Sequence, residues 1–454
     1  MLLSFRFANH RSFRDEQQLN LTPVYPADAK PARPDPAVRV AGIFGANASG
    51  KSNALHALTF MRHLALSSDR EVEPGLGLSN EPFRLNRTHA NEPSRYVVDL
   101  LLDGVRHTYG FTIDSQRVLE EWLYTYPYKK KRCVFERDGD NFSWGEESGK
   151  QGELARIAGI TSPTALFLST AMRFALSGHV SPHDQGTSAT SFFRVYLWFR
   201  RLHVRTRSDG RPDEIRLALA WPEDERDRMI LINILRAADL GISDVIASRL
   251  DHISPTPSET STDDIRGNPW SRIHEFVADL TTHLNRPIRR LRFSHKGADG
   301  DIQLDFQEES AGTKQLLYLS MSAIEALRFG ALMTVDEIDA SLHPMLTAKL
   351  INLFQAPTTN PRGSQLIFTS HDATLLGTFD AEEVLRRDQI WFTEKDEEGA
   401  STLYPLTDFK PRRTGENRPR RYLNGNYGGV PDLSADLFEQ ALVGRGEFDA
   451  QATS

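Results

Sequence analysis

Two hydrophobic patterns divide this chain of 454 residues. Short apolar runs, either continuous or alternating with polar residues, predict β-strands in the N-terminal part and again towards the C-terminus. Apolar residues spaced three and four apart predict amphipathic helices in the middle. The patterns therefore predict a mixed α/β chain in which a mainly helical lobe is inserted between two strand-bearing parts.

The N-terminal strands predict a hairpin followed by an antiparallel sheet. Residues 3–8 and 13–21 form the predicted hairpin, and a linker with five prolines follows at residues 22–36. Further strands are predicted at residues 95–102, 105–113, 120–126 and 132–137. The basic run Lys129–Arg132 lies at one of their turns, where it is either a solvated hairpin tip or a contact for a phosphate backbone.

The helical pattern begins near residue 149 and ends near residue 284. It predicts helices at residues 164–176, 191–202, 223–240 and 270–284, with a polar loop at 254–268. Strands then return at 288–294, 301–307, 331–335 and 365–369, with helices at 316–329 and 345–354. We accordingly predict an N-terminal lobe with an antiparallel sheet at 1–148, a helical lobe at 149–287, a C-terminal lobe at 288–409 and a basic tail at 410–454.

The most specific motif follows an apolar strand predicted at residues 38–44. Gly45–Ser52 matches G-x-x-x-x-G-K-[ST], the phosphate-binding loop, and a helix is predicted directly after it. The glycines let backbone N–H groups surround phosphates at a helix N-terminus, where Lys51 would neutralise the β and γ phosphates and the Ser52 hydroxyl would bind Mg²⁺. A glycine-rich surface turn is the alternative. The motif predicts a nucleoside triphosphate site.

Polar residues at the ends of two later strands suit the same site. Asp336 and Glu337 end an apolar strand, where ligands of parallel α/β sheets lie. Asp336 would hold magnesium, usually through water, and Glu337 would polarise the water that attacks the γ phosphate. His371 ends the next strand and could hydrogen-bond the γ phosphate. The alternatives are that the two carboxylates cap a helix and that His371 is a capping or core residue.

Composition narrows the classes of function. The chain is 39% hydrophobic and 25% charged, with a formal net charge of −7, which is typical of a globular protein without a strongly basic surface. No apolar run reaches the eighteen residues of a membrane span. Cys133 is the single cysteine, so an internal disulfide framework is excluded and a reducing cytoplasm is expected.

Four motifs in this order resemble the ABC-type ATPase heads of the SMC and RecF kind. They are Gly45–Asn53, Glu309–Thr313, Asp336–Pro344 and Thr369–His371, and residues 7–13 resemble the first hairpin of that group. Residues 422–431 resemble the C-terminal motif of the compact AAA-fifteen branch, which includes the RloA-like and PARIS AriA-like ATPases of phage defence and the ATPase half of the OLD nucleases. The likeness covers residues 1–112 and about 288–431.

This resemblance implies a homodimer, or a higher even-numbered oligomer, that encloses ATP and Mg²⁺. Ser310 and Gly312 of one copy would bind the γ phosphate held by Lys51 of the other, and Asp339 would line the interface. The implied nucleotide contacts are Gly45, Asn47, Gly50, Lys51, Ser52, Asn53, Arg11, Ser310 and Gly312, with Glu337, Lys51 and His371 as catalytic residues and Ser52 and Asp336 as metal ligands. One departure is that no glutamine lies between Gln18 and Gln116, although such heads usually carry one after the first helix.

Two functions stay open at the level of the sequence. The first is a defence ATPase that holds or releases a separately encoded effector such as a Toprim-type nuclease, because too few residues follow Pro431 for a fused one. The second is a DNA-repair or chromosome-structure ATPase that contacts DNA through the basic stretches 286–292 and 410–421. Either stretch could instead meet an acidic partner or stay solvated. A nucleotide-gated scaffold with slow hydrolysis is compatible with the first function.

Overall fold

The computed structural model describes residues 1–25, 35–70, 77–145, 151–174, 188–205, 214–238, 240–249, 289–298, 300–379, 382–412 and 415–431. The helix predicted at 270–284, the loop predicted at 254–268 and the N-terminal part of the basic stretch 286–292 lie outside these residues. Residues 26–34 of the predicted linker also lie outside them.

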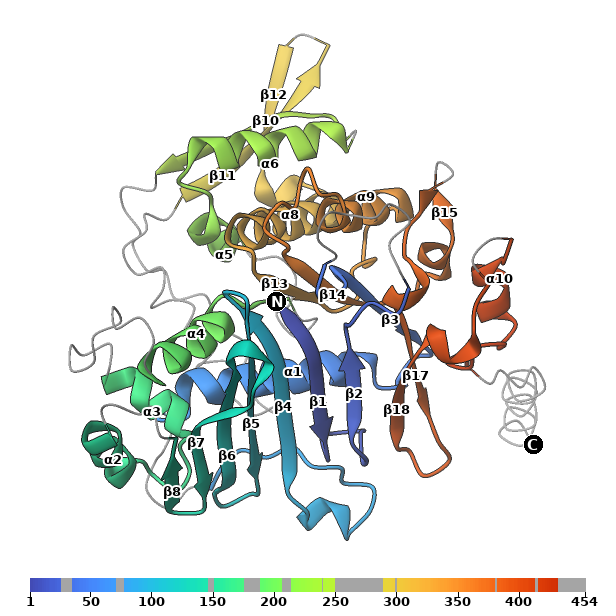
Figure 1. Ribbon diagram of the computed structural model, residues 1–454. Helices are drawn as coiled ribbons and strands as arrows, with labels where there is room; N and C mark the ends of the chain where they lie inside the picture. Colours follow the sequence, from blue (N-terminus) through green and yellow to red (C-terminus); the bar gives the residue numbers. More distant parts are fainter. Residues whose placement is uncertain are drawn as a thin grey trace, which may run out of the picture.

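A six-stranded sheet forms the centre of the molecule (Figure 1). Its strands, in spatial order, are β18 (Ser401–Pro405), β17 (Ile390–Lys395), β3 (Val40–Gly45), β14 (Gln365–Ser370), β13 (Leu332–Val335) and β9 (His203–Arg205). All neighbours pair in parallel except β17 and β18. Every residue of β3, β13 and β14 is buried, because helices cover both faces of this sheet.

Three helices cover the central sheet. On one face α1 (Lys51–Ser67) packs its apolar side against Ala41 and Ile43 of β3. On the other face α8 (Ala311–Phe329) and α9 (Pro344–Gln355) pack against Val40 and Phe44. Side chains of β3 therefore point alternately into two separate cores, as the period of a strand requires.

A seven-stranded antiparallel sheet flanks the central one. Its order is β2 (Gln17–Asn20), β1 (Leu2–Ala8), β4 (Ser94–Leu102), β5 (Val105–Ile113), β6 (Val118–Tyr126), β7 (Arg132–Asp138) and β8 (Asn141–Trp144). Helices α1, α3 (Phe167–Phe174) and α4 (Ser188–Arg200) lie on one face of it, and α2 (Gln151–Ile160) lies beside β8. The strands predicted at residues 95–137 are all present.

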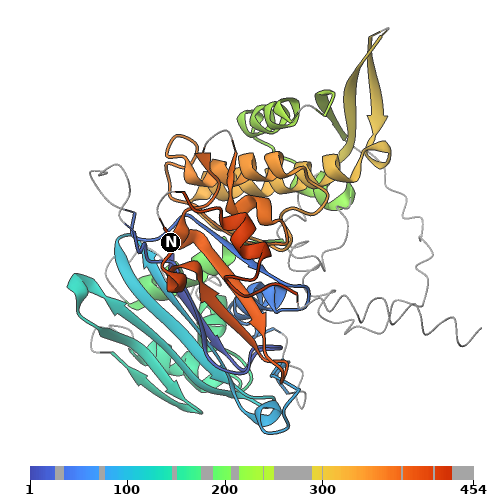
Figure 2. The same ribbon diagram turned by 90° about the vertical axis from the view of Figure 1, so that its right-hand side faces the viewer.

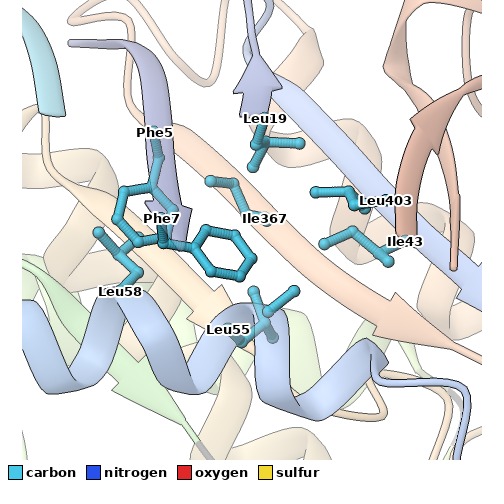
Figure 3. Close-up of a pocket in the computed structure, with 9 residues that line it drawn as sticks. Phe5, Phe7, Leu19, Ile43, Leu55, Leu58, Ile367 and Leu403 are labelled. Carbon is cyan, nitrogen blue, oxygen red and sulfur yellow. The ribbon is translucent and has the colours of Figure 1, made fainter. Parts of the chain in front are cut away.

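The two large sheets meet over α1. A small apolar cavity at this junction is lined by Phe5 and Phe7 of β1, by Ile43 of β3, and by Leu55 and Leu58 of α1, among others (Figure 3). The first hairpin and the helix after the glycine-rich loop therefore share one hydrophobic core.

A small third sheet projects from the end of the molecule that lies away from the seven-stranded sheet (Figures 1 and 2). It contains β10 (Ile242–Arg249), β11 (Arg289–Gly297) and β12 (Gly300–Asp305) in antiparallel order, beside α5 (Glu214–Ala220) and α6 (Glu225–Ala237). The short helix α10 (Arg418–Leu423) and the two-stranded pair β15 (Thr378–Phe379) and β16 (Glu382–Glu383) lie near β17 and β18.

The predicted α/β class, with a mixed central sheet and an antiparallel subdomain, is confirmed. Several details differ from the prediction. Helix α8 begins at Ala311 rather than near residue 316, and strands β8, β9, β10, β17 and β18 were not predicted. Strand β9 belongs to the central sheet although it lies within the predicted helical lobe. The division of the chain into lobes at residues 148, 287 and 409 stays a prediction. Among the described residues, no helix is long and apolar enough to cross a membrane.

Candidate nucleotide-binding site

The glycine-rich loop joins β3 to α1 and is packed from outside by β17 and β18. A Cβ atom at Gly45 would lie 2.5 Å from the carbonyl oxygen of Thr393. Gly50 has a φ of 112° and a Cβ there would lie 2.5 Å from Oγ of Ser401. The hydroxyls of Ser49 and Thr393 are 2.7 Å apart. Both motif glycines are therefore required by close contacts, and Gly50 also by a backbone conformation that other residues rarely adopt.

Lys51 is the first residue of α1 and its side chain curls back over the loop. Its Nζ donates to the carbonyl oxygens of Gly45 and Ala46, both at 2.8 Å, and lies 3.4 Å from Nδ1 of His371. Burial lowers the pKa of Lys51 to about 8, although the charges of Asp336 and Glu337 oppose that shift. The ammonium group thus sits at the loop opening, held by backbone oxygens that phosphate oxygens could replace.

Asp336 connects three elements. It follows β13, and its Oδ1 accepts hydrogen bonds from Ser52 Oγ of α1 at 2.9 Å and from Thr369 Oγ1 of β14 at 2.6 Å. Its backbone N–H donates to the carbonyl of Arg205 in β9 at 2.8 Å. Two hydroxyl groups therefore fix the orientation of the Asp336 carboxylate: that of Thr369, from β14, and that of Ser52, from the glycine-rich motif.

The residues at Asp336 fit magnesium. A carboxylate and a serine hydroxyl are hard oxygen donors, and Mg²⁺ is usually held by one or two protein oxygens together with substrate phosphates and water. Among the described residues, no group of three or more His, Cys, Asp and Glu side chains forms a larger metal cage. Bound there, the ion would neutralise charge on the β and γ phosphates.

Glu337 has a φ of 52°, a conformation that is strained for a residue with a side chain. Its backbone N–H donates to Thr369 Oγ1 at 2.7 Å, and the next N–H, of Ile338, donates to the Thr369 carbonyl at 3.1 Å. These bonds hold the turn, and the Glu337 carboxylate comes within 3.7 Å of His371 Nε2. Because a strained backbone persists only where its surroundings impose it, the position of this carboxylate is set by the fold.

The predicted signature residues lie at the start of α8. Ser310 is exposed and caps the helix, with Oγ accepting from the Thr313 backbone N–H at 3.0 Å. A Cβ at Gly312 would lie 2.8 Å from the carbonyl oxygen of Ser341, whose φ is 62°. The helix start therefore packs on the loop that contains Asp339, within the same chain.

The first hairpin contacts the glycine-rich loop through Ser12. Its Oγ accepts from Asn53 Nδ2 and lies beside Ser401 Oγ, each at 2.8 Å. Arg11, which has a φ of 49°, instead pairs with Glu81 and lies 2.8 Å from Nε2 of His56 on α1. A direct contact of Arg11 with a nucleotide stays a prediction.

The C-terminal motif, residues 422–431, packs against the glycine-rich loop. The Tyr422 hydroxyl donates to the Gly429 carbonyl at 3.1 Å, and burial raises the pKa of this hydroxyl to about 12. A Cβ at Gly429 would lie 3.6 Å from Cα of Gly45. Phe392 of β17 stacks between the rings of Tyr422 and Tyr427. This packing brings residues near position 425 against the loop at position 45.

Much of the basic stretch 410–421 is used within the fold. Arg418 is buried and pairs with Glu383, and it donates to the Leu385 carbonyl at 2.9 Å. Arg421 pairs with Glu416. These two arginines are therefore neutralised by the chain itself, which weakens the case for DNA at this stretch.

The structure thus brings Lys51, Ser52, Asp336, Glu337 and His371 together. Ser310 and Gly312 lie on a different element and face the Asp339 loop. Sequence reasoning did not single out Thr369, Thr393 or Ser401. Thr369 lay inside a quoted motif, whereas Thr393 and Ser401 belong to strands that were not predicted.

Two neighbouring histidines, His10, which is buried, and His56 of α1, which is half-buried, predict a stability that falls in acid. Burial and the charge of Arg11 lower the pKa of His56 to about 4, against a smaller opposing effect of Glu81. His56 is therefore neutral in the folded chain but becomes protonated in the unfolded chain below its ordinary pKa of 6.5. The resulting stability is present above pH 6.5 and is lost as the pH falls towards 4, by about 1.4 kcal/mol per pH unit.

The check is urea unfolding at several pH values between 6.5 and 4, in the wild type and in His56→Gln. The variant should lose stability less steeply with acid. Equal slopes would show that His56 titrates alike in the folded and unfolded chains. His10 lies 3.1 Å from His56, and burial and the neighbouring His56 both lower its pKa, so the difference in slope measures the coupled pair of histidines.

Comparison with known protein families identifies one family that this chain matches. The family model described as "AAA domain, putative AbiEii toxin, Type IV TA system" matches residues 40–377. No curated protein matches the chain.

Solved structures similar to the chain include two SMC heads. One is the Smc head bound to the C-winged helix domain of ScpA, with 12% identity, a TM-score of 0.42 and coverage of 90% of this chain and 99% of that one. The other is the Smc head with an extended coiled coil bound to the C-terminal domain of ScpA from Pyrococcus furiosus, with 14% identity, a TM-score of 0.39 and coverage of 90% and 97%.

Proposed function

Because the chain belongs to the AAA-domain family of the putative AbiEii toxin type, we propose that it binds ATP with Mg²⁺ and hydrolyses it between two copies of itself. The observation that carries this proposal is the cluster of Lys51, Ser52 and Asp336, in which a loop lysine, a hydroxyl and a carboxylate meet at the end of a parallel sheet. This is the arrangement that phosphoryl transfer from a magnesium-bound triphosphate requires.

The chain's own residues have separate roles in this proposal. The backbone N–H groups at the start of α1 and the Lys51 ammonium bind the β and γ phosphates, which displace the Gly45 and Ala46 carbonyls from Nζ. Ser52 and Asp336 hold the metal. Glu337 orients the attacking water and accepts its proton, and His371 donates to the γ phosphate.

The second copy completes the site in this proposal. Ser310 is exposed at the start of α8, where its hydroxyl and the first backbone N–H groups of the helix form an anion-binding surface. Gly312, two residues further along, packs against Ser341 of the loop that also contains Asp339. The γ phosphate held by one copy would bind this helix start of the other, so ATP would join two chains and hydrolysis would release them.

The native mass of Glu337→Gln, with and without ATP and magnesium, tests the proposal. The variant should retain ATP and form an even-numbered assembly, whereas Lys51→Ala should stay in the nucleotide-free form under both conditions. If Glu337→Gln has the mass of one chain in both conditions, assembly around ATP is wrong.

Replacing Ser310 by arginine should prevent the ATP-driven assembly without preventing ATP binding. The added side chain would occupy the surface at which the partner's γ phosphate would lie, so assembly should weaken by at least tenfold, or about 1.4 kcal/mol. Mass photometry of the Glu337→Gln background, with and without Ser310→Arg, measures this. Thr402→Arg, at an exposed hydroxyl residue of β18, is the matched control and should assemble normally.

We place this ATPase in antiviral defence, regulating a separately encoded effector such as a Toprim-type nuclease. The description of the family as a toxin of a toxin–antitoxin system fits a role that depends on a second gene product. Expression with the neighbouring genes, followed by purification of Glu337→Gln, should yield a second polypeptide. A protein that never carries a partner, yet binds duplex DNA with steep salt dependence, would favour the alternative of a RecF-like or SMC-like repair ATPase.

A further inference from the structure

The hairpin between β6 and β7 has a strained and exposed tip. Tyr128 and Lys129 both have positive φ, at 53° and 63°, although neither is glycine. A positive φ at a residue with a side chain is strained relative to an ordinary turn. The strain brings no burial in return, since 93% of the Tyr128 surface is exposed. A turn that keeps an aromatic ring in water at this cost indicates a binding role.

Positive charge surrounds that ring. Lys129, Lys130, Lys131 and Arg132 follow Tyr128 directly, and all four side chains are exposed. Lys129, Lys130 and Lys131 belong to the connection between β6 and β7, and Arg132 is the first residue of β7, so four cations are consecutive at this end of the hairpin. An exposed aromatic ring among cations is the combination that binds bases and phosphates of single-stranded nucleic acid.

The sheet face next to the tip also carries aromatic rings paired with cations. Three aromatic residues alternate along β6 on the face opposite α1 and α4, and a cation lies over each ring. The pairs are Arg95 with Trp122 and Arg106 with Tyr126, each 4.9 Å from the ring centre, and Lys131 with Tyr124 at 3.6 Å.

A glycine makes the first of these pairs possible. Gly110 of β5 is opposite Trp122 on β6 and opposite Val97 on β4, two residues from Arg95, and a Cβ there would lie 2.5 Å from the indole ring. The missing side chain lets the indole lie flat across β5 and reach the arginine. The outer face is therefore a built surface of flat rings and guanidinium groups, on which bases can stack.

The acidic residues of this face are largely engaged. Asp99 accepts from Arg106 at 2.8 Å and from Thr108 at 2.5 Å, and Glu136 accepts from the Tyr124 hydroxyl at 2.5 Å. Glu120 accepts from Thr112 at 2.9 Å at the end of the face away from the tip. The hydroxyl donors are neutral, so Glu120 and Glu136 keep their charges, and the four cations of residues 129–132 outnumber these two carboxylates, in a chain whose formal net charge is −7.

We propose that the β6–β7 hairpin tip and the adjoining outer face of the seven-stranded sheet bind single-stranded nucleic acid. Tyr128 stacks on a base, Lys129 to Arg132 neutralise phosphates, and Trp122 with Arg95 extends the stacking surface along the strand. This surface lies on the antiparallel sheet, apart from the cluster around Lys51, and does not rest on ATP binding.

Fluorescence anisotropy with end-labelled oligo-dT and oligo-rU of about twenty nucleotides tests the proposal. Both strands should bind, a duplex of the same length should bind more weakly, and the dT and rU arms show whether DNA or RNA is preferred. Changing Lys129, Lys130 and Lys131 to Glu should weaken binding by at least about tenfold and reduce the salt slope by about 2. Tyr128→Ala should weaken it by about fivefold or more with little change in slope.

The matched control reverses three exposed charges of the basic stretch at Lys410, Arg412 and Arg420. This control should bind like the wild type, and all variants should melt like it, because the changed side chains are exposed. Normal binding by the tip variant overturns the proposal, as does loss of binding in the control alone or tighter binding of the duplex. Lys51→Ala should bind the strands normally, which separates this result from any failure of the ATPase proposal.

Discussion

Replacing Glu337 by glutamine is expected to lower the rate of ATP hydrolysis by at least about a hundredfold, the usual contribution of a general base. Glutamine keeps the size of the side chain and leaves the Glu337 backbone bond to Thr369 in place, so the strained turn should survive. ATP binding should be retained, because Lys51 and Ser52 are untouched. Phosphate release at saturating ATP and magnesium measures the effect.

A conservative change at a distant carboxylate provides the comparison. Glu382→Gln, at an exposed position of β16, should hydrolyse ATP at the wild-type rate. If Glu337→Gln also keeps the wild-type rate, the attacking water is activated by another group and the role proposed for this carboxylate is wrong. A variant that loses ATP binding as well would show that Glu337 acts on binding instead of the chemical step.

Arg137→Ala is expected to lower the free energy of unfolding by about 3 kcal/mol or more, the usual result of removing one partner from a buried ion pair. The side chains of Arg137 and Glu121 are 1% and 0% exposed and lie 3.8 Å apart. Arg137 also donates to the carbonyls of Gly139 at 2.8 Å and Ala165 at 2.7 Å. The alanine variant would leave these carbonyls without their donor and the buried Glu121 carboxylate without its opposite charge.

The contacts of Glu121, the other member of the pair, explain why losing Arg137 should destabilise more than the sheet itself. Glu121 accepts the backbone N–H groups of Phe167 at 2.6 Å and Leu168 at 3.0 Å, so the pair joins the sheet to the start of α3. Urea unfolding followed by tryptophan fluorescence measures the change. Arg117→Ala, which removes an exposed partner of Asp140, should cost less than about 1 kcal/mol. Similar losses in both variants would mean that the buried pair adds little to stability.

Local sequence patterns were sufficient for the centre of the molecule. The apolar run before Gly45 and the run before Asp336 are long enough to identify strands, and parallel strands bring their carboxyl ends to one edge. The proximity of Ser52 and Asp336 follows from that geometry. Their roles with magnesium stay predictions.

Residues that act through tertiary contacts were beyond such patterns. Strand β9 has only three residues, and its pairing with β13 depends on contacts far along the chain. Thr393 reaches the loop only because β17 pairs with β3, which no local pattern near residue 393 indicates. The bond of Arg11 to Glu81 likewise joins positions that are distant in sequence. In each case the structural role depends on a contact with a distant part of the chain, which the residue type alone does not predict.

The position of β3 between β14 and β17 has a consequence for how the protein is made. The ribosome releases the loop at residues 45–52 early, but its neighbours in the sheet follow only with residues 365–370 and 390–395, and Gly429 comes later still. Until then the apolar side chains of β3 lack their partners. A nascent chain must therefore carry an unfinished loop until residues 365–429 have been synthesised, and only then can the loop take its final packing.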